Sequence, residues 1–328
     1  MSPRGRSKQR RDDEPSLFPE DRPPLPTLQQ PEVATLAAAL PSTLRLGTSS
    51  WSFPGWSGLL YEPARPCSEA ALARDGLRQY VKSPLLRTTG LDRAFYRPLT
   101  VEQGRALAEQ AGEGFRFLVK AYRGLTHRGT EGARFLDSQF AVDAVIEPLR
   151  EGLGSALGTL LVQFPEMGIK ASECNDFLRQ LDRFLSDLPD AVPISVEVRD
   201  RVLLGDSIAG VLAAHGVAFG HAIHPSRPPL AEQLDRLGSA LESVTAPAVL
   251  RWLLRAEHSY QGAQALYEPF DRMLEPDVRS REEAAAYCRL ESLRGRDLFV
   301  IANNKAEGSA PLTLLELAKA IVAGVAAT

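Results

Sequence analysis

Long apolar runs and paired cysteines are both missing from this sequence of 328 residues. No apolar run approaches the roughly 18 residues that a membrane-spanning helix needs, and the N-terminus lacks the apolar core of a secretory signal. The three cysteines, Cys67, Cys174 and Cys288, are widely spaced and odd in number, which argues against a disulfide framework. These absences predict a cytoplasmic protein with no membrane contact.

Fingerprints of well-known catalytic and cofactor sites are missing as well. The sequence contains no phosphate loop, dinucleotide fingerprint, serine nucleophile elbow, zinc-protease helix or paired CxxC motif. His221 and His224 stand three residues apart, but a metal pair would need further ligands whose placement the pattern does not supply. We therefore predict neither a cofactor nor a metal site.

Charge of one sign is not in excess either. The 38 Lys and Arg residues face 41 Asp and Glu residues, so the net charge is −3. This balance gives no overall attraction to nucleic acid and leaves only local basic patches to consider.

The first 42 residues differ in composition from the rest. They begin SPRGRSKQRR and contain few bulky apolar side chains, so burial would not offset their chain entropy. We predict a disordered tail over 1–42 and a single domain over 43–328. The basic start of the tail is either a solvated terminus or a contact for nucleic-acid phosphates.

Beyond residue 42, short apolar segments alternate with helical patterns. Leu44 and Leu46 flank Arg45 in a strand-like alternation, and Gly47 then opens a loop rich in hydroxyls and tryptophan. The nearly all-apolar run at 158–164 is typical of a parallel strand buried on both faces. The predicted strands begin at residue 44 and continue at 84–89, 115–121, 158–164, 193–198, 217–223, 249–254 and 298–302.

Helical signals fall between these strands. Thr100 and Gln103 form a capping-box pattern, Asp206 is a candidate N-cap, and Gly216 is a stop signal. Further helices are predicted over 137–149, 172–188 and 312–325. Eight strands with such connections favour an α/β fold, a TIM-barrel-like (β/α) barrel with about eight parallel strands. Functional residues are then expected on the loops after the strands, because that face gathers side chains from all eight.

Those loops carry polar, basic and aromatic side chains that suit an anionic ligand with a planar part. Arginine forks match phosphate or carboxylate groups, and aromatic faces stack on rings. The candidate ligand-binding residues are Trp51, Asp92, Tyr96, Lys120, Arg199, Arg251, Asn303 and Asn304, and the candidate catalytic residues are Glu197 and His127.

Several of these candidates also have a purely structural interpretation. Glu197 and Arg199 lie on the same side of a strand, so they form either an ion pair that organises the barrel mouth or part of a catalytic site. Lys120 and His127 are either an anion-binding or acid–base pair, or a solvated loop pair.

Residues in the loops after the first and last predicted strands also have both a ligand-binding and a structural interpretation. Trp51 and Trp56 either cover a ligand or close the end of the barrel, and Asn303 and Asn304 suit turn hydrogen bonds as well as a ligand. Because the first and last strands of a barrel are neighbours, the hydroxyls after Gly47 are expected to meet Asn303 across the seam.

Six stretches of the sequence resemble a known family. They are GTSSWSFPGWSG (47–58), AFYRPLT (94–100), GFRFLVKAYRGLTH (114–127), LGTLLVQFP (157–165), SVEVRD (195–200) and VIANNKAEGSAP (300–311). In this order they are similar to the bacterial and archaeal family called domain of unknown function 72, or YecE-like. The resemblance covers nearly the whole chain after residue 42, and it implies a TIM-barrel-like fold and no known reaction.

The resemblance has one informative departure. Many members of that family carry an acidic residue two positions before an asparagine in the loop that precedes the FY pair. This chain has Gly90 and Asp92 there. Any role of that acidic residue is therefore either lost here or taken over by Asp92.

Three functional hypotheses follow. The first is binding of a phosphate-bearing or nucleotide-like ligand at the strand ends, with Glu197 as general base and His127 as acid in a metal-independent hydrolase or lyase. The second is a non-catalytic nucleic-acid-binding module. The third, by fold analogy alone, is a metal-dependent barrel nuclease or isomerase.

Overall fold

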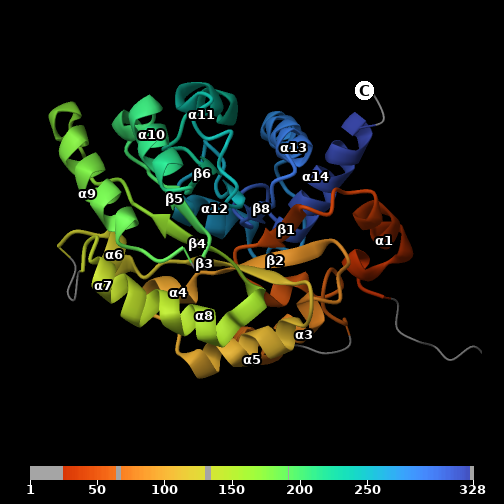
Figure 1. The fold of residues 1–328 in the computed structure, drawn as a ribbon. Helices are drawn as coiled ribbons and strands as arrows, with labels where there is room; N and C mark the ends of the chain where they lie inside the picture. Colours follow the sequence, from red (N-terminus) through yellow and green to blue (C-terminus); the bar gives the residue numbers. More distant parts are fainter. Residues whose placement is uncertain (1–24, 64–67, 130–133, 191, 326–328) are drawn as a thin grey trace, which may run out of the picture.

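The computed structural model describes residues 25–63, 68–129, 134–190 and 192–325. A closed barrel of eight parallel strands lies at its centre, with the strands in sequential order and helices around them (Figure 1). The strands are β1 (Leu44–Thr48), β2 (Leu86–Leu91), β3 (Arg116–Lys120), β4 (Leu157–Gln163), β5 (Ile194–Glu197), β6 (Ala218–Ile223), β7 (Ala248–Trp252) and β8 (Leu298–Ala302). The predicted TIM-barrel-like fold is confirmed.

The ring closes where β1 pairs with β8. Leu44 lies opposite Leu298, and Thr48 lies opposite Ala302. On its other side, β1 pairs with β2, and the register shifts between Leu46 and Gly47. The two strands approach closely there, because a Cβ atom added to Gly47 would lie 2.0 Å from the carbonyl oxygen of Thr88. A glycine at this position is therefore required by the packing of β1 on β2.

Alternation along the strands divides the apolar side chains between two layers. Leu118, Leu161, Val249, Phe299 and Ile301 form a small buried cluster contributed by β3, β4, β7 and β8. Their sequence neighbours on the same strands belong to the main core, which packs between the strands and the helices. The small cluster fills the inside of the barrel, as expected for this fold.

The helices connect the strands and enclose them. They are α1 (Pro31–Ala38), α2 (Glu69–Asp75), α3 (Leu77–Tyr80), α4 (Arg93–Tyr96), α5 (Val101–Ala111), α6 (Arg123–Thr126), α7 (Ser138–Ala141), α8 (Glu147–Leu153), α9 (Cys174–Ser186), α10 (Asp206–Ala214), α11 (Leu230–Leu237), α12 (Tyr260–Tyr267), α13 (Val278–Leu293) and α14 (Ala310–Val325). Within the described residues, no helix is long and apolar enough to span a bilayer.

The capping signals are largely confirmed. Thr100 and Gln103 form the predicted capping box at the start of α5, with hydrogen bonds of 3.3 and 3.1 Å. Gly205, and not Asp206, is the N-cap of α10, so the Asp206 carboxylate lies in the first turn, where it complements the helix dipole. The helix predicted over 137–149 is divided into α7, a π-helical turn (Val142–Ile146) and α8.

The prediction of a disordered tail is wrong for residues 25–40. This segment forms a 3₁₀ turn (Thr27–Gln29) and α1, and Leu28, Val33, Ala37 and Leu40 are buried. The spacing of the last three residues places them on one helical face, a signal that averaging over the polar N-terminus conceals. The basic start of the chain lies outside the described residues.

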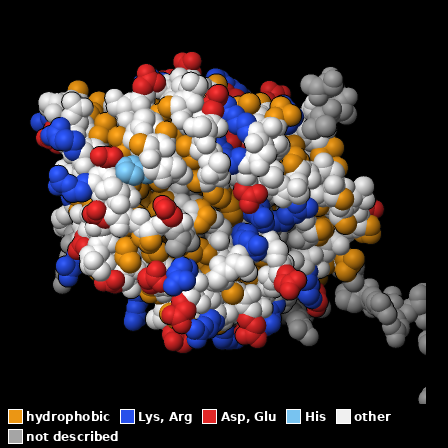
Figure 2. Space-filling model, viewed as in Figure 1, with side chains coloured by type: hydrophobic (Ala, Val, Ile, Leu, Met, Phe, Trp, Pro, Cys, Tyr) orange, Lys and Arg blue, Asp and Glu red, His pale blue; other side chains and the backbone are white. Residues whose placement is uncertain are grey.

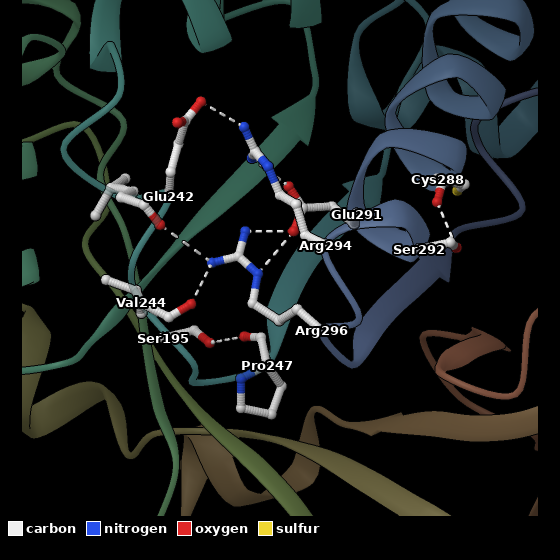
Figure 3. A network of polar contacts seen from close by, with 10 residues as sticks. Ser195, Glu242, Val244, Pro247, Cys288, Glu291, Ser292, Arg294 and Arg296 are labelled. Carbon is white, nitrogen blue, oxygen red and sulfur yellow. Dashed lines mark hydrogen bonds and ion pairs between the residues drawn. The ribbon is translucent and has the colours of Figure 1, made fainter.

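The end of the barrel where the strands begin is held by a buried ion network (Figure 3). Glu291 of α13 is completely buried and accepts hydrogen bonds from Arg294 at 2.9 Å and Arg296 at 2.7 Å. Arg296 also donates to the carbonyl oxygen of Val244 at 3.2 Å, which ties the segment before β8 to the segment before β7. Each charge of this network has a protein partner, so its role is structural.

Candidate functional site

Strand geometry places one layer of polar side chains at the mouth of the barrel. Residues two positions apart on a strand point to the same face. Lys120, Gln163, Arg251 and Asn303 each follow a member of the interior cluster by two positions, and Glu197 pairs with Gln163 in the sheet. These five side chains therefore project toward the barrel axis at the carboxyl ends of the strands.

Glu197 is the buried carboxylate of this layer. Its side chain is fully buried, and its Oε2 accepts a hydrogen bond of 2.8 Å from Nη1 of Arg251. Its Oε1 lies 3.5 Å from Nε of Arg199, without a hydrogen bond from any described residue. Burial by itself would raise the pKa of Glu197, but the charges of Arg251 and Arg199 outweigh burial and lower it. Glu197 is therefore an anion at neutral pH.

Lys120 is the cation of this layer that lacks a carboxylate partner. Its Nζ lies 3.7 Å from the centre of the Phe95 ring, and no described carboxylate oxygen comes within 4.0 Å of it. Burial, followed by the nearby charge of Arg251, lowers the pKa of Lys120 to about 8, while Asp92 and Glu197 oppose the shift. Lys120 is thus mostly protonated at pH 7 and loses its charge on a small rise in pH.

His127 lies beside Lys120, at the end of α6. Its ring packs edge-on against Phe95 at 5.3 Å, and its Nδ1 is 3.0 Å from the Thr126 hydroxyl. Burial and the charge of Lys120 lower the pKa of His127. A neutral imidazole accepts a proton more readily than it donates one at pH 7, so this direction does not favour the predicted acid role.

Basic groups outnumber acidic ones around the mouth. Lys120, Arg199 and Arg251 act electrostatically on Glu197, whereas Asp92 is the other carboxylate that acts on Lys120. The two signs are interspersed over the face of the molecule seen in Figure 2. The excess of positive charge is therefore a local property of the mouth.

The two histidines at β6 diverge: His221 lies within the strand, and His224 follows it. His221 points outward and packs against Phe219 and Tyr287, each at a ring distance of 5.1 Å. His224 faces the mouth, where burial and Arg199 lower its pKa to about 4, and its Nδ1 lies 2.9 Å from the Ser226 hydroxyl. Within the described part of the chain, no group of three or more His, Cys, Asp or Glu residues is arranged to hold a metal ion.

Three other predicted site residues lie outside this charged cluster. Trp51 is buried and donates its indole N–H to the Leu72 carbonyl at 3.0 Å. It borders a cavity of about 150 Å³ together with Asp92. Tyr96 is 66% exposed and leans edge-on against Phe95 at 5.2 Å. Asn304 is buried, and its Oδ1 accepts from the backbone N–H of Ala310 at the start of α14.

The seam between β1 and β8 carries the predicted contact. Nδ2 of Asn303 donates to the Ser49 hydroxyl at 3.1 Å, and Oδ1 accepts from the backbone N–H of Lys305 at 3.0 Å. Trp56 is completely buried and packs against Phe53 at 4.8 Å, so it belongs to the core and not to the mouth.

Sequence reasoning missed Phe95 as a site residue. It lies between Lys120 and His127, whereas its neighbour Tyr96 points to solvent. The FY pair identifies an aromatic position after β2, but the turn of α4 decides which ring faces the mouth.

Comparison with known proteins identifies the family. The family model described as "Protein of unknown function DUF72" matches residues 45–327. The chain belongs to the DUF72 family. A DUF72 protein of Enterococcus faecalis V583 is 18% identical over 85% of this chain and 95% of its own, with a TM-score of 0.61. A DUF72 protein of Thermotoga maritima MSB8 is 21% identical over 84% of this chain and 98% of its own, with a TM-score of 0.57.

These two structures share the fold of this DUF72 protein. At such identities the likeness supports the barrel and says nothing of a ligand. No curated protein matches the chain in sequence. The chemistry of the site therefore has to be argued from the barrel mouth itself.

Proposed function

We propose that the barrel mouth binds a phosphate-bearing ligand through Lys120, Arg199 and Arg251. The observation that carries this proposal is the convergence of three cations on one buried carboxylate, with Lys120 left without an acidic partner among the described residues. An anionic ligand would neutralise the excess charge. A phosphate group suits the arrangement because it accepts both from a point-like ammonium and from a planar guanidinium.

The three cations have different parts in this proposal. Arg251 is buried and already donates to Glu197, so it contributes its electrostatic field and holds the carboxylate in place. Arg199 is partly exposed and donates no hydrogen bond to another described residue, so its guanidinium is available to a ligand. Lys120 adds a second donor that forms no hydrogen bond with another described residue, and its charge also acts on Glu197.

We further propose that a reaction at this site is a metal-independent hydrolysis or lyase reaction. Lys120 donates the proton, because it is charged at pH 7 and its pKa is close to neutrality. Glu197 stabilises positive charge that develops on the substrate, or accepts a proton, through the Oε1 atom that no described group hydrogen-bonds.

The proposal predicts that charge removal at the mouth weakens anion binding. In the double variant Lys120→Met/Arg199→Met, the affinity for inorganic phosphate and for AMP should fall by roughly 100-fold or more, because each charge-assisted contact contributes about 1.5–3 kcal/mol. Isothermal titration calorimetry at fixed ionic strength measures this change.

A matched control separates this effect from the loss of net charge. Arg179→Met/Lys319→Met removes the same two charges from exposed helical positions, where each is paired with a neighbouring carboxylate, and should leave phosphate affinity unchanged. Equal affinities of the two double variants would contradict the proposal. Tight binding of a mixed-sequence oligonucleotide with a steep salt dependence, and none of AMP, would instead favour a nucleic-acid-binding module.

The lowered pKa of Lys120 predicts a pH dependence of anion binding. Sulfate keeps both charges between about pH 7 and pH 10, so a change in its affinity over this range reports on the protein. The charged groups that act on Lys120 are Arg251, Asp92, Glu197 and Arg199.

Because the cationic form of Lys120 binds the anion, sulfate affinity should fall as the pH rises through about 8. Lys120→Arg should abolish this dependence, since a guanidinium stays charged throughout the range. A wild-type affinity that is flat from pH 7 to about pH 9.5 would exclude Lys120 as a contact.

A further inference from the structure

The choice of lysine at position 120 is unusual for this chain. The sequence contains six lysines, at positions 8, 82, 120, 170, 305 and 319, among 38 basic residues. The other mouth cations, Arg199 and Arg251, follow the general preference of the chain for arginine. Arginine supplies charge and hydrogen bonds but does not lose its proton, whereas the amine of lysine can become neutral and act as a nucleophile. Position 120 therefore has a property that anion binding alone does not need.

The surroundings of Lys120 favour such a nucleophile. Its ammonium group lies 3.7 Å from the centre of the Phe95 ring, and it donates no hydrogen bond to any described residue. The side chain is partly exposed, so a ligand at the mouth can reach Nζ. Burial is the main cause that lowers the pKa of Lys120, and Arg251 and Arg199 add to it, while Asp92 and Glu197 favour the charged form of the amine. Desolvation together with neighbouring positive charge is the arrangement by which enzymes activate a lysine for attack on a carbonyl carbon.

Lys305 provides an internal contrast. It is buried and lies over aromatic rings, 4.0 Å from the centre of the Tyr260 ring and 5.5 Å from that of Phe270. Contact with an aromatic ring is thus shared by both lysines, while Lys120 is the more exposed of the two.

We propose that Lys120 forms an imine with the aldehyde or ketone group of a phosphate-bearing substrate held at the barrel mouth. This inference rests on the proposed anion site, replaces the proton-donor role of Lys120 with that of a nucleophile, and makes the substrate a phosphorylated carbonyl compound. Arg199, whose charge acts on Lys120, would bind the phosphate group and hold the substrate at the mouth beside Lys120.

The step balances without a further reactant. The ammonium of Lys120 and the carbonyl compound give a protonated imine and one molecule of water. The carbonyl oxygen leaves with two hydrogens of the nitrogen, a C=N bond replaces the C=O bond, and the positive charge is conserved. The protonated imine then withdraws electrons from a bond on the adjoining carbon, which is the chemistry of a lyase. Glu197, which remains ionised beside it, stabilises the positive charge.

Reductive trapping tests the inference with the wild-type protein. The probe is glycolaldehyde phosphate with sodium cyanoborohydride at pH 7.5, and peptide mass mapping reports the alkylation of each lysine. Lys120 should be modified at least tenfold faster than Lys82 and Lys170, and an excess of inorganic sulfate should slow only the modification of Lys120. Unphosphorylated glycolaldehyde should show a much smaller preference for Lys120, because it lacks the group that Arg199 would bind.

Two further measurements make the result decisive. Lys120→Arg should show no trapping at position 120, with circular dichroism confirming its fold, and titration of the wild-type protein with inorganic phosphate reports separately on the anion site. If Lys120 reacts no faster than Lys82 and Lys170 while phosphate still binds, the imine is refuted and the anion site stands. If phosphate does not bind either, the proposed function fails together with this inference.

Discussion

Replacing Arg251 with methionine should cost this protein about 3–5 kcal/mol of its free energy of unfolding. The Glu197 carboxylate is fully buried, and Arg251 supplies its one hydrogen bond from a described residue, at 2.8 Å. Removal of the guanidinium leaves the buried charge with Arg199, at 3.5 Å, as the one described cation within 4.0 Å, and with the more distant charge of Lys120. Urea denaturation followed by far-UV circular dichroism measures the change at pH 7.

A variant that neutralises Glu197 identifies the cause of the stability lost in Arg251→Met. Glu197→Gln removes the buried charge, so the double variant Glu197→Gln/Arg251→Met should recover at least half of the stability lost in Arg251→Met. A double-mutant cycle reports the interaction energy directly. If the double variant is as unstable as Arg251→Met, the loss comes from packing around the arginine stem and not from the uncompensated carboxylate.

Gly47→Ala should be the other highly destabilising substitution, with an expected loss of about 3 kcal/mol or more. The added Cβ would lie 2.0 Å from the carbonyl oxygen of Thr88 and 2.5 Å from its carbonyl carbon. Both atoms belong to the backbone of the neighbouring strand, so no side-chain rotation relieves the overlap. Relief requires β1 and β2 to separate at the point where their register shifts.

Gly210→Ala is the appropriate control for this prediction. Gly210 lies in α10, and a Cβ atom added there would meet no atom within 4 Å. The same chemical change should therefore stabilise the protein by about 0.5–1 kcal/mol, through helix propensity alone. Thermal and urea denaturation of both variants, side by side, test the pair. An equal and small effect at both positions would contradict the close approach of β1 and β2.

The barrel could be predicted because buried parallel strands are apolar on both faces. The strand predicted over 298–302 coincides with β8, and the run at 158–164 is one residue displaced from β4. The strand predicted over 249–254 ends early, at Trp252, because Leu253 and Leu254 leave the sheet and pack with Ala263 of α12. The composition of residues 253–254 is typical of a strand, and only their tertiary contacts show that they lie beyond its end.

Helix α13 could not be predicted in the same way. Its buried face is built from Ala284, Ala285, Tyr287, Cys288 and Glu291. Small side chains and one buried carboxylate give a weak apolar periodicity, although the helix packs firmly. The burial of Glu291 depends on Arg294, at the i,i+3 spacing of a helical ion pair, and on Arg296, which lies beyond the end of α13 and which helical spacing does not indicate.

The composition of the site was predictable, but its pairings were not. Strand alternation alone indicates that Lys120, Glu197 and Arg251 face one end of the barrel. The sequence suggests Arg199 as the partner of Glu197, whereas the shorter contact comes from Arg251, 54 residues away. The sequence brings Lys120 and His127 together, but the burial that chiefly lowers the pKa of His127 comes from the fold.

Closure of the ring also has a consequence for the order of folding. Arg45 on β1 contacts Asp297, next to β8, across 252 residues of chain. The edge of β1 that pairs with β8 has no partner until β8 has been synthesised. The nascent sheet therefore has two open edges for most of its translation. Such long-range closure is slow. A ribosome-bound chain that stops before residue 298 should therefore be captured by chaperones that recognise unpaired strands, and release of the full chain should end that capture.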